Sequence, residues 1–342
     1  MEMVNCMKKL IKKLLPQKIR NILIGKYYNK YLLKRNYKFD MKKYLKYSFD
    51  FGVEKTKRHY EADLIFYYHK IEKALSLPNP RVGFGKSVIE ELIKKLEHYT
   101  HHYGWDEVSL ISLNTLEAYY KFNKENNVDL PDLLNTIKTF KKNIESNNQV
   151  NSGGVIEINR NDIAKMSNIN FKDFVYSRYS IRNFAPGEVS LDLIEEAVYI
   201  AQKTPSVCNR QSARVYVYSD ENIKKEVLKY QNGNAGFGEH ADKILIVTED
   251  LRDFRGAIER NQCFIDGGLY SMTLLYALHS LGVGACPLNL CLNYKTELKL
   301  KEVAKIDDHE ALIMMIAVGN IPEKLKVAAS PRRKVEDVMT VY

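Results

Sequence analysis

Residues 190–219 read SLDLIEEAVYIAQKTPSVCNRQSARVYVYS and join three kinds of local structure. Ser190 precedes apolar residues at helical spacing with acids near their start, which predicts a capped helix over 191–201. The alternating residues 214–219 predict a strand. Between them, the loop 205–211 carries short polar side chains and free backbone amides, which suit a planar heterocycle with alternating donors and acceptors.

The sequence after this stretch continues to alternate helices with strands. We expect helices over 220–230, 255–281 and 295–305, and strands over 243–248 and 311–318. This interleaving predicts an α+β fold with a layered sheet. The stretch from Gly267 to Tyr294 has no formal charge, but its glycines, asparagines and proline favour a core helix ending at Gly282, followed by a tight loop, over a membrane span.

Two basic motifs flank this region. Arg178, Ser180 and Arg182 occupy alternate positions, so in an extended segment their side chains point to one side and suit a phosphate group. A surface strand with two solvated arginines explains the same motif when it is taken alone. Near the other end, Arg332 and Arg333 form a basic pair that could supply a second phosphate contact.

Taken in order, these motifs resemble the FMN-dependent nitroreductase family. The resemblance covers residues 171–342 and rests on R-x-S-x-R at 178–182, P-S-x-x-N-x-Q at 205–211, a long central helix ending in L-G-x-G, a late buried strand and the C-terminal basic pair. It implies a nitroreductase-like homodimer with two FMN sites at the subunit interface. Flavin N5, rather than a catalytic side chain, would pass hydride from NADH or NADPH to a small electron-poor acceptor of the nitro, quinone or enone type.

The resemblance also implies roles for individual residues. The FMN phosphate would be held by Arg178, Ser180 and Arg333, with Arg332 as the second choice, while Arg182 would lie toward N1 and the C2 carbonyl. The partner subunit would contribute Pro205, Ser206, Asn209 and Gln211 to the ring and ribityl chain. Asn234 matches the amide at the pyrimidine edge, and Pro287, Leu288 and Asn289 would pack on one flavin face.

Some positions depart from the family's pattern. Ser212 and Ala213 follow the loop where Pro and an aromatic residue are common, Cys208 replaces a small hydroxyl residue, and Phe237 stands where some members have Lys. These differences leave the electron donor and acceptor open. The alternative is a flavin-binding redox sensor or assembly partner with little turnover.

The N-terminal half has a different organisation. Amphipathic runs at 58–75, 86–101, 106–124 and 130–145 predict helices and no strands. We therefore expect four parts: a basic helical arm (1–50), an all-helical domain (51–145), a linker (146–170) and the nitroreductase-like FMN-binding domain (171–342).

The net charge of +10 is concentrated in the arm. Residues 1–50 hold 14 Lys or Arg and three acids, so the rest of the chain is close to neutral. The arm could pack on the protein, bind an anionic membrane surface or bind nucleic acid. No nucleic-acid motif accompanies it, so nucleic acid is not expected as a partner.

The remaining signals concern compartment and metal. Five scattered Cys indicate a reducing compartment, so we expect a cytoplasmic protein, with a peripheral place at the inner face of the membrane if the arm binds lipid. No metal site is expected. The Cys pair, Cys286 and Cys291, has no His nearby, and the His group, His98, His101 and His102, has no accompanying carboxylate or Cys pattern. The segment 69–85 is a helix–helix corner with a His69–Glu72 ion pair or, less favoured, a pocket.

Overall fold

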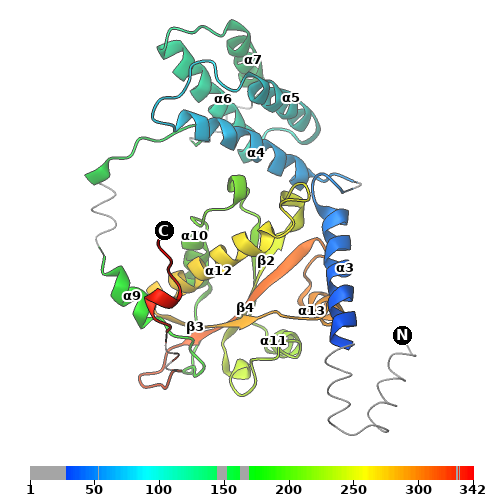
Figure 1. Cartoon of the computed structure of the whole chain (residues 1–342), viewed down its shortest axis with the longest axis vertical. Helices are drawn as coiled ribbons and strands as arrows, with labels where there is room; N and C mark the ends of the chain where they lie inside the picture. Colours follow the sequence, from blue (N-terminus) through cyan, green and yellow to red (C-terminus); the bar gives the residue numbers. More distant parts are fainter. Residues whose placement is uncertain (1–27, 53, 145–151, 162–168, 329, 331) are drawn as a thin grey trace.

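The structure is a computed structural model that describes residues 28–52, 54–144, 152–161, 169–328, 330 and 332–342. Helices alone form one end of the molecule, and a body of helices around a sheet forms the other (Figure 1). The predicted architecture, an all-helical region followed by an α+β region, is confirmed.

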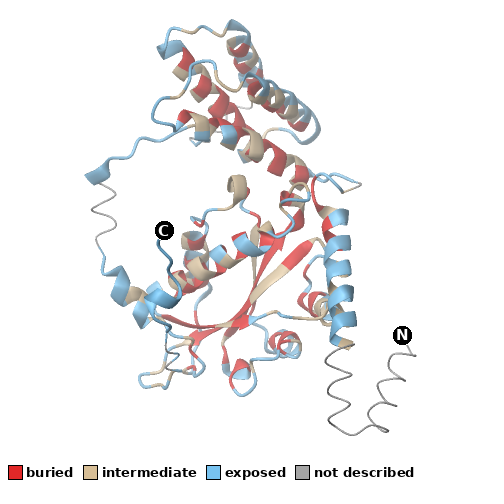
Figure 2. Ribbon diagram, in the orientation of Figure 1, coloured by how far each residue is buried: buried red, intermediate tan, exposed pale blue. Residues whose placement is uncertain are grey.

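The helical end consists of α4 (Lys57–Leu75), α5 (Lys86–Tyr103), α6 (Glu107–Glu125) and α7 (Pro131–Lys142). Each lies within a few residues of the run that predicted it. Their apolar faces share one buried core, seen as the red interior of this end in Figure 2. At the start of α6, the Asp106 carboxylate accepts from the Ser109 amide and forms the N-terminal cap.

The corner between α4 and α5 matches the favoured interpretation of 69–85. His69 Nδ1 lies 3.2 Å from a Glu72 carboxylate oxygen on the same helix face. The turn is tied to α6, where the Gly83 amide donates to Asn123 Oδ1 and the Tyr119 hydroxyl donates to the Phe84 carbonyl. These contacts make the segment part of the packing between helices.

The body is built on a four-stranded antiparallel sheet in the order β1-β2-β4-β3. The strands are β1 (Ala213–Tyr218), β2 (Lys243–Asp250), β3 (Val283–Asn289) and β4 (Glu310–Asn320). All eight residues of β2 are buried, as expected for a central strand with both faces covered.

Alternate side chains of the sheet enter two separate cores. Leu245 and Val247 face α10 (Leu191–Ala201) and α12 (Gln262–Ser280). Ile244 and Ile246 face α11 (Glu221–Leu228) and α13 (Tyr294–Ala304). The body therefore has three layers, helices–sheet–helices, which follow from the period-2 alternation of the strands.

Two predictions for this region are wrong. The stretch after Gly282 is the strand β3, not a tight loop; its Gly284 and Pro287 weaken the strand signal, and Pro287 is tolerated because β3 pairs with β4 alone among the described strands. The long helix begins at Gln262 rather than at 255, because Gly256 has φ +58° and the Arg255 amide donates to the Glu259 carboxylate at 2.6 Å.

The structure describes the predicted basic helical arm (1–50) from residue 28 onward, and residues 1–27 lie outside the described residues. Its visible part is α3 (Asn29–Tyr47), which runs along the edge of the body beside α13 (Figure 1). No helix in the described ranges combines the length and apolar character needed to cross a bilayer. The uncharged stretch from Gly267 is instead the core helix α12 followed by β3.

Candidate functional site

The residues of the R-x-S-x-R motif, Arg178, Ser180 and Arg182, line one pocket of about 710 Å³, here called the arginine pocket. It lies between α9 (Phe171–Ser177), α12 and the C-terminal segment, which returns to α9 in Figure 1. Its polar lining comprises Arg178, Ser180, Arg182, Ser330 and Arg332. Residues about 150 positions apart in the sequence thus meet around one cavity.

Arg178 is the residue of this pocket best placed to hold an anion. It follows the last residue of α9, where the backbone becomes extended, and its side chain is half-buried. Its Nη1 atom is buried and has no hydrogen-bond partner among the described residues. A buried guanidinium nitrogen without an acceptor is costly unless a ligand supplies one, and a phosphate oxygen fits that need.

The C-terminal arginines are placed differently from each other. Arg332 lines the arginine pocket, and its guanidinium donates to the Ser330 carbonyl. Both arginines are exposed, but Arg333 is not among the residues that line this pocket. The geometry therefore favours Arg332, the second choice from the sequence, for a contact with an anion at Arg178.

Predicted site residues of the loop 205–211 lie at a different cavity of about 540 Å³, here called the loop pocket. Pro205, Ser206 and Gln211 line it together with Glu249 and Asp266. α12 contributes Asp266 and Tyr270 to the loop pocket but Met272 and Tyr276 to the arginine pocket, so the two cavities lie against different faces of this helix. Within one chain, the two groups are not brought together.

The loop 205–211 has an unusual backbone. Cys208, Asn209 and Gln211 have φ values of 51°, 53° and 52°, in the left-handed region that non-glycine residues rarely adopt. The Gln211 amide donates to Ser206 Oγ at 3.0 Å, and the Val207 amide donates to Asp266 at 3.0 Å. Such strain costs on the order of 1–3 kcal/mol per residue and persists where the surroundings hold it.

A residue of the helical end of the molecule helps to hold the backbone of the loop 205–211 in this conformation. Arg58 of α4 donates from Nη2 to the carbonyls of Arg210 and Gln211, both at 3.3 Å. The same nitrogen donates to Asp253 Oδ2 at 2.6 Å. Arg210 is itself buried, and its guanidinium donates to Glu259 at 2.9 Å. A helix outside the α+β body thus braces the loop predicted to contact a heterocycle.

The remaining predicted site residues are Asn234 and the β3 residues Pro287, Leu288 and Asn289, and a hydrogen-bond chain through Gln231 connects Asn234 with the end of β3. Asn234 donates from Nδ2 to the Leu228 carbonyl at 2.9 Å and to the Gln231 carbonyl at 2.6 Å, while Gln231 Nε2 donates to the Asn289 carbonyl at 3.0 Å. The Arg182 guanidinium carbon lies 6.0 Å from the centre of the Phe237 ring, which links this loop to the arginine pocket.

The residues of β3 are not equally available to a ligand. Pro287 is half-buried and Asn289 is exposed. The side chain of Leu288 is buried in the core, so only its backbone is available.

One known family resembles the part of the chain that carries these residues. The nitroreductase family model matches residues 175–235 and 225–320. Residues 175–320 of this chain are thus similar to the nitroreductase family. The match includes Arg178, the loop 205–211 and β3, and ends before Arg332. No curated protein matches the chain.

Several solved structures of nitroreductases also match about half of the chain. One is a nitroreductase family protein from Streptococcus pneumoniae, 20% identical, covering 51% of this chain and 100% of its own, with a TM-score of 0.44. Another, an FMN-dependent nitroreductase from Clostridium difficile, is 17% identical over 49% of this chain and 96% of its own, with a TM-score of 0.42. A protein of Desulfovibrio desulfuricans, described as a nitroreductase in complex with FMN, is 19% identical over 52% and 98%, with a TM-score of 0.45.

The nitroreductase region holds one titratable residue that sequence reasoning missed. Glu249 is fully buried at the loop pocket, and burial raises the pKa of its carboxyl to about 8. The Ser212 hydroxyl donates to one of its oxygens, while the other, Oε1, has no partner among the described residues. The only signal of this residue in the sequence is an acid near the end of the apolar run of β2.

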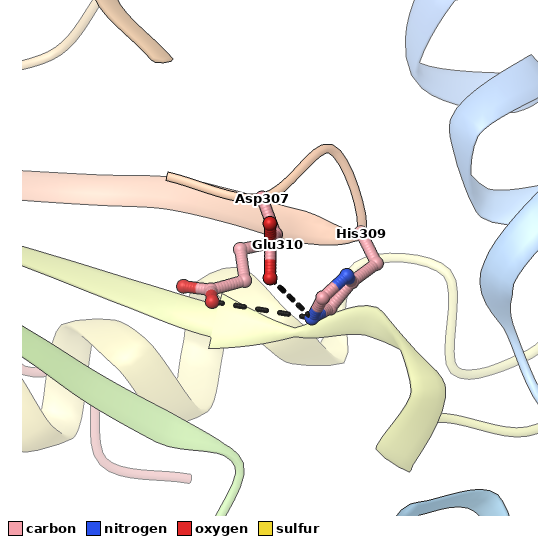
Figure 3. Close-up of side chains that lie close together, drawn as sticks. All are labelled: Asp307, His309 and Glu310. Atoms are coloured by element: carbon pink, nitrogen blue, oxygen red, sulfur yellow. Dashed lines mark ion pairs between the residues drawn. The ribbon is translucent and has the colours of Figure 1, made fainter. Parts of the chain in front are cut away.

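A second titratable group lies where β4 begins. Figure 3 shows Asp307, His309 and Glu310, with His309 Nε2 4.0 Å from both carboxylates. The two oxygens of Glu310 already accept from the hydroxyls of Tyr216 and Thr248, and Asp307 is exposed. Burial lowers the pKa of His309, which favours its neutral form. We interpret the group as a hydrogen-bonded network of the sheet.

The other candidate metal ligands lie in the core or at the surface. Cys286 belongs to β3, its side chain is buried in the core, and burial raises the pKa of its thiol, whereas Cys291 is exposed. His98, His101 and His102 are exposed at the end of α5 and contact one another through their rings.

Proposed function

We propose that this protein is an FMN-dependent oxidoreductase that passes hydride from NADH or NADPH to a small electron-poor acceptor of the nitro, quinone or enone type. The observation that supports it most is the arginine pocket with the unpartnered nitrogen of Arg178. Bound FMN would supply the hydride-accepting atom, N5, so no side chain has to act as nucleophile or general base.

The chain's own residues would bind and orient the cofactor. Arg178, Ser180 and Arg332 would hold the phosphate through charge-assisted hydrogen bonds. Arg182 would place a fixed positive charge near the pyrimidine edge, where negative charge accumulates on reduction. The strained loop 205–211 would present backbone amides and the polar side chains of Ser206, Asn209 and Gln211 to the ring and ribityl chain.

We further propose that each site is shared between two copies of the chain. The arginine pocket and the loop pocket lie against different faces of α12, so one chain does not bring both groups to one ligand. A homodimer with two-fold symmetry would let the loop of one subunit complete the arginine pocket of the other. Two equivalent sites per dimer then follow.

The test starts with the purified full chain. Its absorbance spectrum is recorded, released flavin is identified by chromatography, and the holoprotein is mixed with NADH and with NADPH without oxygen. We expect bound FMN and bleaching of the flavin absorbance by one of the two donors. Protein that takes up no FMN when it is supplied would refute the proposal. Bound FMN that neither donor bleaches would instead favour a redox sensor or assembly partner.

A further inference from the structure

The outward face of α3 carries two parallel rows of side chains. Leu33, Tyr37, Met41 and Leu45 follow one another every four residues and are 55%, 68%, 54% and 43% exposed. Residues four apart on a helix lie on one face, so these four form a continuous apolar row. The neighbouring row consists of four exposed lysines, Lys30, Lys34, Lys38 and Lys42.

The opposite face of α3 is fixed to the body. Lys43 donates to Glu297 of α13 at 2.5 Å, and the Tyr44 hydroxyl donates to the Gly256 carbonyl at 2.7 Å. The Tyr47 hydroxyl donates to Asp308 at 2.6 Å. The helix is therefore held in one orientation, and Figure 2 shows its exposed side turned away from the body. Packing on the protein explains one face of α3 and leaves the other without a role.

The four lysines of the outer face have no acidic partner in the described part of the chain. The ion pairs of α3 are made by Lys43 with Glu297 and by Lys46 with Asp308. The outer face is thus both apolar and uncompensated in positive charge. A partner that suits it must offer negative charge beside an apolar layer.

We propose that the outer face of α3 lies on an anionic lipid bilayer, a property beyond the proposed flavin chemistry. Leu33, Tyr37 and Met41 would enter the boundary between headgroups and acyl chains, while the lysines would contact anionic headgroups. Nucleic acid would use the lysines and leave the apolar row in water. A second copy packed with its α3 helix against this one across a two-fold axis would bring lysines against lysines.

The test is co-sedimentation of the full chain with vesicles of phosphatidylcholine, with and without phosphatidylserine. Binding is expected to the anionic vesicles, with weakening as salt is raised. One variant replaces Lys30, Lys34, Lys38 and Lys42 with Gln, and a second replaces Leu33, Tyr37 and Met41 with Ser. Each lysine removed is expected to lower the partition coefficient roughly fivefold, and the apolar variant should bind at least tenfold more weakly than the original chain.

The control has the same charge change elsewhere on the molecule. Lys121, Lys124, Lys138 and Lys142 are exposed on α6 and α7, at the helical end, and their replacement with Gln should leave vesicle binding unchanged. All these positions are exposed, so folding should be preserved, which circular dichroism checks.

Three outcomes would overturn the proposal. The first is equal binding of all variants to anionic vesicles. The second is loss of binding in the lysine variant while the apolar variant binds fully, since lipid insertion requires both rows. The third is tight retention of the chain by duplex DNA that the lysine variant alone abolishes, which would assign the face to nucleic acid.

Discussion

Glu249 shows how a single buried residue can make the stability of this fold depend on pH. Its pKa rises from about 4.5 in an unfolded chain to about 8 in the fold, because burial disfavours the carboxylate. The folded state therefore holds a proton that the unfolded state releases. The resulting contribution to stability is full below the unfolded pKa and is lost as pH rises through about 8.

The prediction concerns Glu249→Gln, which keeps the shape and a hydrogen bond with Ser212 but cannot ionise. Relative to the original chain, its free energy of unfolding should increase between pH values of about 5 and 8, by several kcal/mol, since one pKa unit corresponds to about 1.4 kcal/mol. Urea denaturation across this pH range measures the difference. A constant difference at all pH values would show that Glu249 does not hold the proton.

A second residue-scale prediction separates the two neighbouring C-terminal arginines. Arg178→Ala combined with Arg332→Ala should weaken FMN binding a hundredfold or more, since each phosphate contact is worth roughly 1.5–3 kcal/mol. Arg178→Ala combined with Arg333→Ala should lose about the effect of Arg178 alone, because Arg333 does not line the pocket. Fluorescence titration of the apoprotein with FMN measures both. Equal losses would return the phosphate role to Arg333.

At the scale of elements, α4 contributes to the backbone of the loop 205–211, although α4 lies outside the region that the family model matches. Arg58 pairs with Asp253, which is fully buried and has no other hydrogen-bond donor among the described residues. Arg58→Ala should destabilise the protein by about 3–5 kcal/mol, because it leaves a buried carboxylate unpaired. Thermal unfolding measures this loss.

The double variant Arg58→Ala with Asp253→Asn separates charge from positioning. It removes the unpaired carboxylate, so most of the melting temperature should return. The carbonyls of Arg210 and Gln211 still lack their donor, so FMN affinity should stay below that of the original chain. Full recovery of affinity would mean that Arg58 does not position the loop.

The elements also show where sequence patterns succeed. Side chains of helices and of the central strands repeat with a clear period, and α4–α7, β1, β2 and β4 lie close to their predicted ranges. β3 was missed because Gly284 and Pro287 interrupt the pattern, while its strand geometry comes from pairing with β4. The false start of α12 has a local cause, the left-handed backbone at Gly256.

At the scale of the whole molecule, the sequence shows which site residues belong to one motif, but it does not show how far apart the motifs lie in the fold. Arg178, Ser180 and Arg182, which the sequence grouped by their spacing, all line one pocket, as does the intervening Tyr179. Contacts between residues far apart in the sequence could not be predicted. Arg332 rather than Arg333 lines that pocket, and Arg58 donates to the carbonyl of Arg210, 152 residues away. Those relations depend on tertiary packing, which no periodicity encodes.

The proposed sharing of sites between two subunits can be tested by complementation. One variant, Arg178→Ala with Arg332→Ala, lacks the phosphate contacts; a second, Ser206→Ala with Gln211→Ala, lacks loop contacts. Each alone should retain little FMN. Subunits of the two mixed at random would form hybrid dimers with one site built from intact halves, so FMN content should rise to about a quarter of that of the original protein. Chromatographic flavin analysis after exchange measures it, with each variant exchanged against itself as the control. If each chain instead built its own site, every site in the mixture would carry a defect, and no flavin would be regained.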